Sequence, residues 1–164
     1  QWDERKKEEG KYDNSILEGI PRALPALLRA YRVQKRAASV GFDWQKVEDV
    51  ITKLDEEIQE FKDALKNWNA LKSETASSSQ IFIEDEFGDL LFTLVNISRH
   101  ISVQPENALT RATNKFIGRF KHIEKKAKEM GCELASLSLN EMDSLWEEAK
   151  ALEYNHNSDS VELK

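Results

Sequence analysis

Two short acidic segments contain the residue types in this sequence that could hold a metal ion. The first runs Lys53-Leu54-Asp55-Glu56-Glu57-Ile58-Gln59-Glu60, and the second runs Glu84-Asp85-Glu86-Phe87-Gly88-Asp89. Carboxylates three or four residues apart on a helix repel one another, which costs roughly 0.2–0.5 kcal/mol per pair. A divalent cation removes this cost, and ligands that are all oxygen atoms suit a hard ion such as Mg²⁺ or Mn²⁺. The two segments together therefore predict a site for a hard divalent ion such as Mg²⁺ or Mn²⁺.

The first segment is expected to lie on a helix. Apolar side chains around it recur every three or four residues, at Val47, Val50, Ile51, Leu54, Ile58, Phe61 and Leu65, and this period marks one face of a helix. At about 100° per residue, Lys53, Glu57 and Glu60 share one border of that face, whereas Glu56 lies opposite. Two carboxylates and a lysine thus lie beside the expected core, although a solvated acidic face remains the alternative for this helix taken alone.

The second segment lies in a more apolar stretch. Its helix is expected to bury Ile83, Phe87, Leu90, Leu91, Leu94 and Ile101 and to carry a polar row of Glu86, Asp89, Thr93 and Asn96 along the edge. The apolar neighbours of Asp89 predict a helix that is covered on most sides. Because an unpaired carboxylate is costly in an apolar interior, solvation explains Asp89 poorly, and a metal ion shared with the first segment explains it better.

Both motifs are similar to those of a known enzyme family. The pattern Lys53-x-x-Glu56-Glu57-x-x-Glu60, followed by Glu86-x-x-Asp89, resembles the MazG family of nucleoside triphosphate pyrophosphohydrolases, within the all-α NTP pyrophosphatase superfamily. The similarity covers about residues 16–152 and includes Gly19 to Leu28, Val40 to Trp44, Asn114 to Phe116, Arg119 with Phe120, and Trp146. It implies an all-α bundle of four to five helices that cleaves a nucleoside triphosphate between the α and β phosphates, giving a monophosphate and pyrophosphate.

The resemblance also implies roles for individual residues. Mg²⁺, or Mn²⁺ in its place, would be held by Glu57, Glu60, Glu86 and Asp89. The ion would bridge phosphate oxygens and activate a water molecule. Lys53 would offset the negative charge of the transition state, and Glu56 or Glu60 would take the proton of the water. The expected catalytic group is therefore Lys53, Glu56, Glu57 and Glu60.

A second set of candidate residues is expected to bind the nucleotide. Lys115 and Arg119 are four residues apart and flank the apolar face of an expected helix. A triphosphate needs cations, and the arginine fork suits phosphate oxygens, although a solvated basic edge is the alternative. Asn114 could bond sugar or phosphate, and Trp146 either stacks on a base or fills the bundle. The expected substrate-binding group is Asn114, Lys115, Arg119 and Trp146, with Lys53.

Composition limits the expected partners. A chain of 164 residues suits one domain, and its net charge of −6 argues against nucleic-acid binding. One cysteine, Cys132, cannot form an internal disulfide, which is typical of the cytoplasm. No apolar run is long enough to span a membrane. We expect a cytoplasmic enzyme that, by its resemblance, forms a homodimer and clears damaged or surplus nucleotides.

Prolines, glycines and capping residues predict where the helices begin and end. Pro21 and Pro25 open a first helix, which Gly41 ends. Asp43 is expected to cap a second helix that begins near Trp44 or Gln45 and ends near Leu71. Phe42 and Trp44 are expected as core anchors, although the resemblance implies that this neighbourhood lies close to the nucleotide. Residues 72–80, rich in serine, predict a flexible loop, and residues 81–101 predict a third helix.

The second half of the chain carries similar signals. Pro105 and Gly131 bound a fourth helix, and the capping box Ser138-Leu139-Asn140-Glu141 opens a last one. Its inward positions are expected to be Leu139, Met142, Leu145, Trp146, Ala149 and Leu152. Residues 1–15 predict a linker or exposed segment and residues 153–164 a frayed tail. With its leading linker, the sequence resembles the C-terminal domain of longer MazG proteins.

Three other interpretations remain open at this point. A nucleotide hydrolase of the same fold could act on a deoxynucleotide such as dUTP or dCTP, or on a guanosine alarmone. A non-catalytic helical interaction module would also explain the helices, but not Asp89. A di-iron carboxylate bundle requires a pair of Glu-x-x-His motifs, whereas the sequence has only one, Glu153-Tyr154-Asn155-His156.

Overall fold

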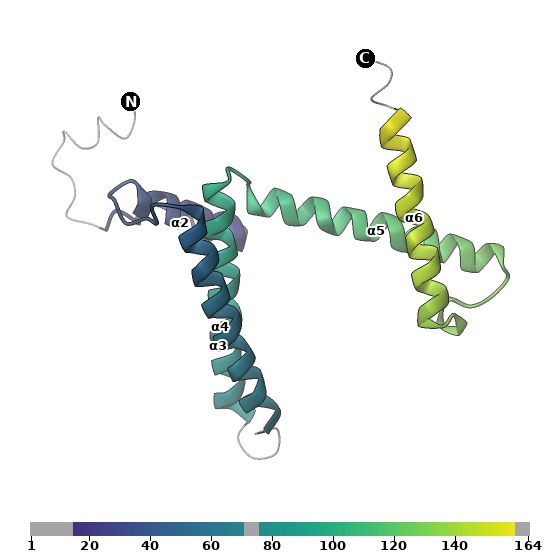
Figure 1. Ribbon diagram of the computed structural model, residues 1–164, viewed down its shortest axis with the longest axis horizontal. Coiled ribbons are helices and arrows are strands. Elements are labelled where there is room, and N and C mark those ends of the chain that lie inside the picture. The colour runs from purple at the N-terminus through teal and green to yellow at the C-terminus, as the bar shows by residue number, and fades with distance from the viewer. Residues whose placement is uncertain (1–14, 71–75, 160–164) are drawn as a thin grey trace. The chain divides into compact units, whose positions relative to one another are not determined.

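The computed structural model describes residues 15–70 and 76–159, which are helical apart from short connections (Figure 1). Five α-helices and one 3₁₀ helix follow one another: α2 (Ala26–Ala38), α3 (Val47–Ala70), α4 (Ala76–His100), α5 (Pro105–Glu129), η1 (Leu134–Ser136) and α6 (Leu139–Asp159). No strand occurs in these two ranges. The all-α class predicted from the sequence is confirmed.

The chain divides into two compact units, which are described separately. The first unit comprises residues 1–108 and holds α2, α3 and α4; the second comprises residues 109–164 and holds most of α5 and all of α6. In the first unit α3 packs along α4, and α2 packs against α4. In the second, α6 lies across α5 (Figure 1). The expected single domain over residues 16–152 stays a prediction.

Each unit has a small apolar core. In the first unit Val50 and Ala64 of α3 and Val95 of α4 are buried, each at most 2% exposed. In the second unit Ile123 and Ala127 of α5 and Ala149 of α6 are buried. Because Ala64, Ala127 and Ala149 are small, the helices can approach one another closely at these positions.

The face of α4 that is buried differs from the one its sequence predicts. Phe87, Leu91 and Leu94, expected inside, are 50%, 39% and 47% exposed in the described chain, whereas Thr93 of the expected polar row is buried. The physical reason is that α4 is apolar on more than one side, and α2 and α3 cover only part of it. The expectation of a helix covered on most sides is wrong for the described chain, and Asp89 is exposed.

Gly41 ends the first helix region as predicted. Its φ of +87° lies in the left-handed region that favours glycine. The Gly41 N–H donates to the Ala38 carbonyl oxygen, and the Phe42 N–H donates to that of Ala37. These bonds satisfy carbonyl groups that the end of α2 would otherwise leave open.

Two expectations for the turn after α2 are wrong. The next helix begins at Val47 rather than near Trp44, and the Asp43 carboxylate, expected to cap it, pairs with Arg99 of α4 instead. Phe42 and Trp44, expected as core anchors, are 82% and 44% exposed. A tertiary ion pair thus decides the conformation of this turn, and sequence spacing does not reveal such a partner.

The predicted loop and tail are shorter than expected. Residues 76–80, assigned to a flexible loop, form the first turns of α4, and residues 71–75 lie outside the described residues. Alanine and glutamine favour helix without any apolar period. The absence of an apolar period in this segment is therefore not sufficient to predict a loop. Residues 153–159, assigned to a frayed tail, continue α6. Residues 1–14 and 160–164 lie outside the described residues.

The capping box at the start of α6 is confirmed. The Ser138 N–H and hydroxyl donate to Glu141 Oε2 at 2.8 and 2.6 Å, and the Glu141 N–H donates to Ser138 Oγ at 3.3 Å. These two donors of Ser138 lower the pKa of Glu141. Leu139, expected inward, is 81% exposed, because the first residue after a cap lies before the packed face of α6 begins.

Candidate metal centre

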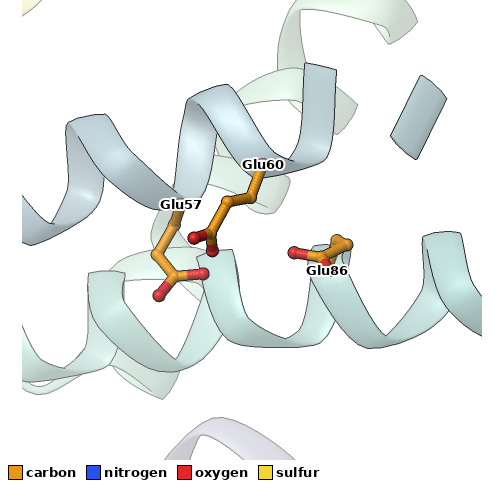
Figure 2. A group of neighbouring side chains, drawn as sticks. All are labelled: Glu57, Glu60 and Glu86. Carbon is orange, nitrogen blue, oxygen red and sulfur yellow. The ribbon is translucent and has the colours of Figure 1, made fainter. Parts of the chain in front are cut away.

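Three glutamates meet in the seam between α3 and α4. Glu57 and Glu60 extend from α3, Glu86 extends from α4, and each offers a carboxylate oxygen within 4.8 Å of the others (Figure 2). Glu57 is 6% exposed, Glu86 is half-buried and Glu60 is exposed. The three-glutamate group is therefore open to solvent on the Glu60 side and closed on the Glu57 side.

The electrostatics of this group fit a cation. Desolvation, followed by the charges of Glu60, Asp89 and Glu57, raises the pKa of Glu86. Glu57 Oε2 is buried without a hydrogen-bond partner among the described residues, and a buried acceptor left unsatisfied is costly. A divalent ion would satisfy that oxygen and remove the repulsion, and carboxylate oxygens are the ligands that Mg²⁺ prefers.

Lys53 supplies positive charge at the edge of the group. Its Nζ lies 2.8 Å from Glu57 Oε1 and 3.3 Å from Glu56 Oε2. The bonds to Glu57 and then Glu56 raise the pKa of Lys53 well above its usual value, so this side chain stays protonated. Glu56, with a side chain 59% exposed, is outside the three-glutamate group but is joined to it through Lys53.

Asp89, predicted as a fourth ligand, lies outside the three-glutamate group. It is exposed on α4, and its charge contributes to the raised pKa of Glu86. The sequence predicts burial because the neighbours of Asp89 are apolar, but Phe87, Leu91 and Phe92 are themselves exposed. Because Asp89 is exposed, its charge does not need a metal ion to offset the cost of burial. The role of Asp89 as a metal ligand stays a prediction.

Four of the five predicted nucleotide-binding residues lie in the second unit, whereas Lys53 lies on α3 in the first. The Arg119 guanidinium carbon lies 5.3 Å from the ring centre of Trp146, and the Phe116 ring lies 5.1 Å from the same indole. Asn114 and Lys115 line a surface hollow of about 500 Å³ together with Arg111 and Glu153.

Sequence reasoning missed two of the residues that line the hollow. Arg111 precedes Lys115 by one helical turn, so the spacing could have shown that both share a face of α5. Glu153 lies in the segment for which the sequence predicts a frayed tail, and a frayed tail does not pack against α5.

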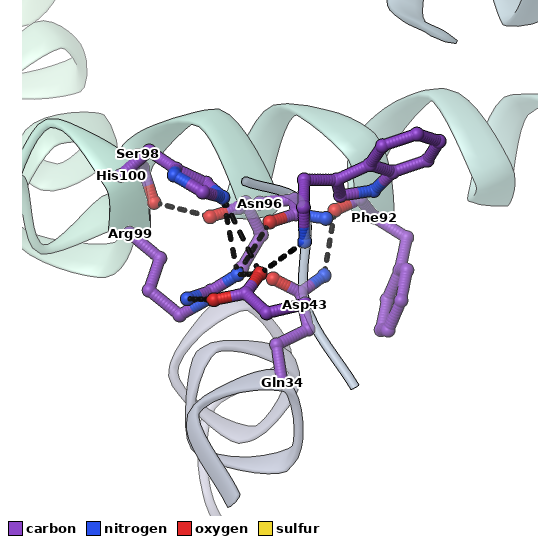
Figure 3. A network of polar contacts seen from close by, with 9 residues as sticks. Gln34, Asp43, Phe92, Asn96, Ser98, Arg99 and His100 are labelled. Carbon is purple, nitrogen blue, oxygen red and sulfur yellow. Dashed lines mark hydrogen bonds and ion pairs between the residues drawn. The ribbon is translucent and has the colours of Figure 1, made fainter. Parts of the chain in front are cut away.

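A second polar network fixes the turn after α2 (Figure 3). The Arg99 guanidinium donates through Nη1 to Asp43 Oδ2 at 2.7 Å and through Nη2 to Asn96 Oδ1 at 2.8 Å, and Nη2 also bonds Asp43 Oδ1. His100 Nε2 lies 3.4 Å from Asp43 Oδ1. Arg99 lowers the pKa of Asp43. No sequence signal pointed to this pair, because its members are distant along the chain.

No helix among the described residues is both long and apolar enough to cross a bilayer.

The helical fold and the carboxylates between α3 and α4 agree with the class of protein to which the sequence is similar. Residues 45–124 match the family model described as the MazG nucleotide pyrophosphohydrolase domain. This range includes Lys53, both acidic segments and the residues Asn114 to Arg119. The chain therefore contains a MazG nucleotide pyrophosphohydrolase domain.

Several relatives are similar in sequence to most of the chain. It is 40% identical over 151 residues to the nucleoside triphosphate pyrophosphohydrolase/pyrophosphatase MazG of Thermotoga maritima, covering 92% of the chain and 54% of that protein. It is 39% identical over 154 residues to the nucleoside triphosphate pyrophosphohydrolase of Escherichia coli K12, covering 93% and 56%. Against the uncharacterized protein YabN of Bacillus subtilis the identity is 44% over 153 residues, covering 93% and 29%. The chain thus spans about half the length of the two named enzymes.

Proposed function

We propose that this chain is a Mg²⁺-dependent nucleoside triphosphate pyrophosphohydrolase that cleaves between the α and β phosphates and releases a nucleoside monophosphate and pyrophosphate. The observation that carries the proposal is the group of Glu57, Glu60 and Glu86, with its buried and unsatisfied Glu57 oxygen. The names of the relatives in Thermotoga maritima and Escherichia coli support the reaction class.

The three glutamates, with Asp89 as a further candidate, would hold the ion. When bound, Mg²⁺ supplies charge that stabilises phosphate oxygens and favours deprotonation of an attacking water molecule. Mn²⁺ prefers similar oxygen ligands and is proposed as a substitute.

The neighbouring side chains have complementary tasks. Lys53 is held in its protonated form by Glu57 and Glu56, and its charge would offset the negative charge that develops on the phosphates. Glu56 lies outside the three-glutamate group, so its carboxylate is available to accept the proton of the water. Glu60 is the alternative acceptor, because it is the exposed member of the group.

The second unit would bind the nucleotide itself. Lys115 and Arg119 supply positive charge for phosphate oxygens, and Asn114 offers an amide to sugar or phosphate. Trp146 contacts Phe116 and Arg119, and these contacts fill the unit. The part of the indole that they leave uncovered would provide an apolar surface for the base. None of these residues favours one base, and dUTP, dCTP and a guanosine alarmone remain alternative substrates.

We also propose that the chain acts as a homodimer in the cytoplasm and removes unwanted nucleotides. The exposed apolar side chains of α4, among them Phe87, Leu91 and Leu94, form a surface that a second copy would cover, because contiguous apolar surface favours association. Light scattering after gel filtration is expected to give twice the monomer mass of 18.9 kDa. A monomer mass at micromolar concentration would contradict the dimer.

Product analysis tests the reaction. The protein is incubated with each common ribo- and deoxyribonucleoside triphosphate, with and without Mg²⁺, and the products are separated by anion exchange. We expect monophosphate and pyrophosphate in equal amounts, only with the metal. Formation of a diphosphate and phosphate would exclude the proposed bond, and no turnover together with no Mg²⁺ binding would favour the non-catalytic interaction module.

A further inference from the structure

Glu153 of α6 holds one edge of the Arg119 guanidinium. Arg119 Nε lies 3.3 Å from Glu153 Oε1 and 3.1 Å from Oε2, and Arg119 Nη2 lies 2.8 Å from Oε2. The guanidinium carbon of the same side chain lies over the Trp146 ring, 5.3 Å from the ring centre. The Arg119 side chain is therefore held by two neighbours, a carboxylate at one edge and an indole.

The edge that Glu153 uses leaves the other edge of the guanidinium available. An arginine has five N–H donors in a rigid fork. The bonds to Glu153 are made by Nε and Nη2, so Nη1 takes no part in them. The fork of Nη1 and Nη2 is the edge that binds a phosphate group through two parallel hydrogen bonds.

The Arg119–Glu153 pair lies at the border of the surface hollow. Glu153 itself lines the hollow with Arg111, Asn114 and Lys115. Arg119, with a side chain 20% exposed, is bonded directly to that wall. A hollow of about 500 Å³ is within the range of small-molecule sites, which is about 300–1,000 Å³.

A purely stabilising role accounts poorly for this geometry. The Glu153 side chain is 39% exposed, and exposed ion pairs contribute little to stability. The same helix pair already has a similar ion pair further along, Glu148 with Lys126 at 2.9 Å, and neither of these residues lines the hollow. What distinguishes Glu153 is that it lines the hollow and that its cation lies over an indole.

We propose that Glu153 is a positioning residue, which acts through Arg119: it fixes the guanidinium so that the Nη1 edge meets a phosphate group of a nucleotide bound in the hollow. Preorganisation of this kind lowers the entropy lost when the ligand binds, because a free arginine side chain samples many rotamers. The inference rests on the proposed function and adds to it a residue that the sequence assigned to a disordered end.

Steady-state kinetics with Glu153→Gln tests the inference. Glutamine keeps the size of the side chain but loses its charge and one acceptor, so we expect KM to rise about five- to tenfold with kcat nearly unchanged, as for a contact equally strong in ground and transition states. The matched control is Glu148→Gln, which breaks an ion pair between the same two helices. Its KM is expected to stay within about twofold of the wild type.

A double variant separates positioning from an independent effect. If Glu153 acts through Arg119, adding Glu153→Gln to Arg119→Ala leaves KM at the value of Arg119→Ala alone. Multiplicative effects of the two changes, or a wild-type KM in Glu153→Gln, would overturn the proposal. Circular dichroism and thermal unfolding of each variant identify any loss of structure.

Calorimetry with a non-hydrolysable triphosphate analogue measures nucleotide binding separately from hydrolysis. It therefore distinguishes failure of the positioning role from failure of the proposed reaction. If the wild type binds the analogue without turning over any triphosphate, the proposed function fails. The comparison of Kd between wild type and Glu153→Gln then still supports or overturns the positioning role. If the wild type neither binds nor hydrolyses, both proposals are overturned.

Discussion

Replacement of Glu57 by glutamine is expected to lower Mg²⁺-dependent hydrolysis by at least about 100-fold, since even residues that only support a metal ligand cost 10–100-fold. Glu57 contributes the buried oxygen without a partner among the described residues, and an uncharged amide oxygen binds Mg²⁺ more weakly than a carboxylate does. The fold is expected to survive. The lost bond to Lys53 is offset by reduced repulsion on Glu86, so the free energy of unfolding without Mg²⁺ changes by less than about 1 kcal/mol.

Thermal unfolding with and without Mg²⁺ provides the second readout for Glu57→Gln. At 100 times Kd a ligand stabilises the wild type by about 2.7 kcal/mol, which raises Tm by about 5–10 °C for a chain of this size. The variant should show no such rise. Asp63→Asn is the matched control, because Asp63 lies on α3 outside the three-glutamate group and pairs with exposed Lys66 and Gln59. A Glu57→Gln variant that keeps the Mg²⁺-dependent rise would remove Glu57 from the ligands.

Asp43→Ala is expected to destabilise the protein by about 2–3 kcal/mol. Arg99 has a side chain only 12% exposed and would keep its charge without its carboxylate partner. Removing one member of a fully buried pair costs about 3–5 kcal/mol, and the value here is lower because the Asp43 side chain is 26% exposed. Replacing Arg99 by methionine in the Asp43→Ala background should recover part of the loss, since no unpaired charge then remains.

The loss depends on pH in a defined direction. Arg99 lowers the pKa of Asp43 in the folded chain, so the stabilisation is complete above the ordinary aspartate pKa of about 3.9. It disappears as the pH falls through the lower folded value. Urea unfolding at pH 7 and near pH 3 should therefore show a smaller difference between wild type and variant in acid. Asp55→Ala on α3 is the control, with an expected change within about 0.5 kcal/mol at pH 7, and an Asp43→Ala variant that behaves like it would contradict the prediction.

Features set by neighbouring residues could be predicted from the sequence. Gly41, Pro105 and the box of Ser138 and Glu141 begin or end helices where expected, because each acts on backbone groups within a few residues of itself. The start of α3 could not be predicted in this way, since it depends on the pairing of Asp43 with a residue on another helix.

The face that each helix buries was harder to predict. The first acidic helix has one apolar face, and Glu57 and Glu60 lie together beside Glu86. The α4 helix carries apolar side chains on several of its faces, so no single period shows which face packs. For that reason the sequence predicts a buried position for Asp89. The pairing of Glu153 with Arg119 could not be predicted, because the two residues lie on different helices and no sequence period links them.

The division of the chain into two units has an evolutionary consequence. The three glutamates and Lys53 belong to residues 1–108, whereas Asn114, Lys115, Arg119, Trp146 and Glu153 belong to residues 109–164. Under the proposed function, substitutions in the second unit can change which nucleotide is preferred while the carboxylates that hold the ion remain untouched. Related chains could thus diverge in substrate range and inherit the same hydrolytic machinery.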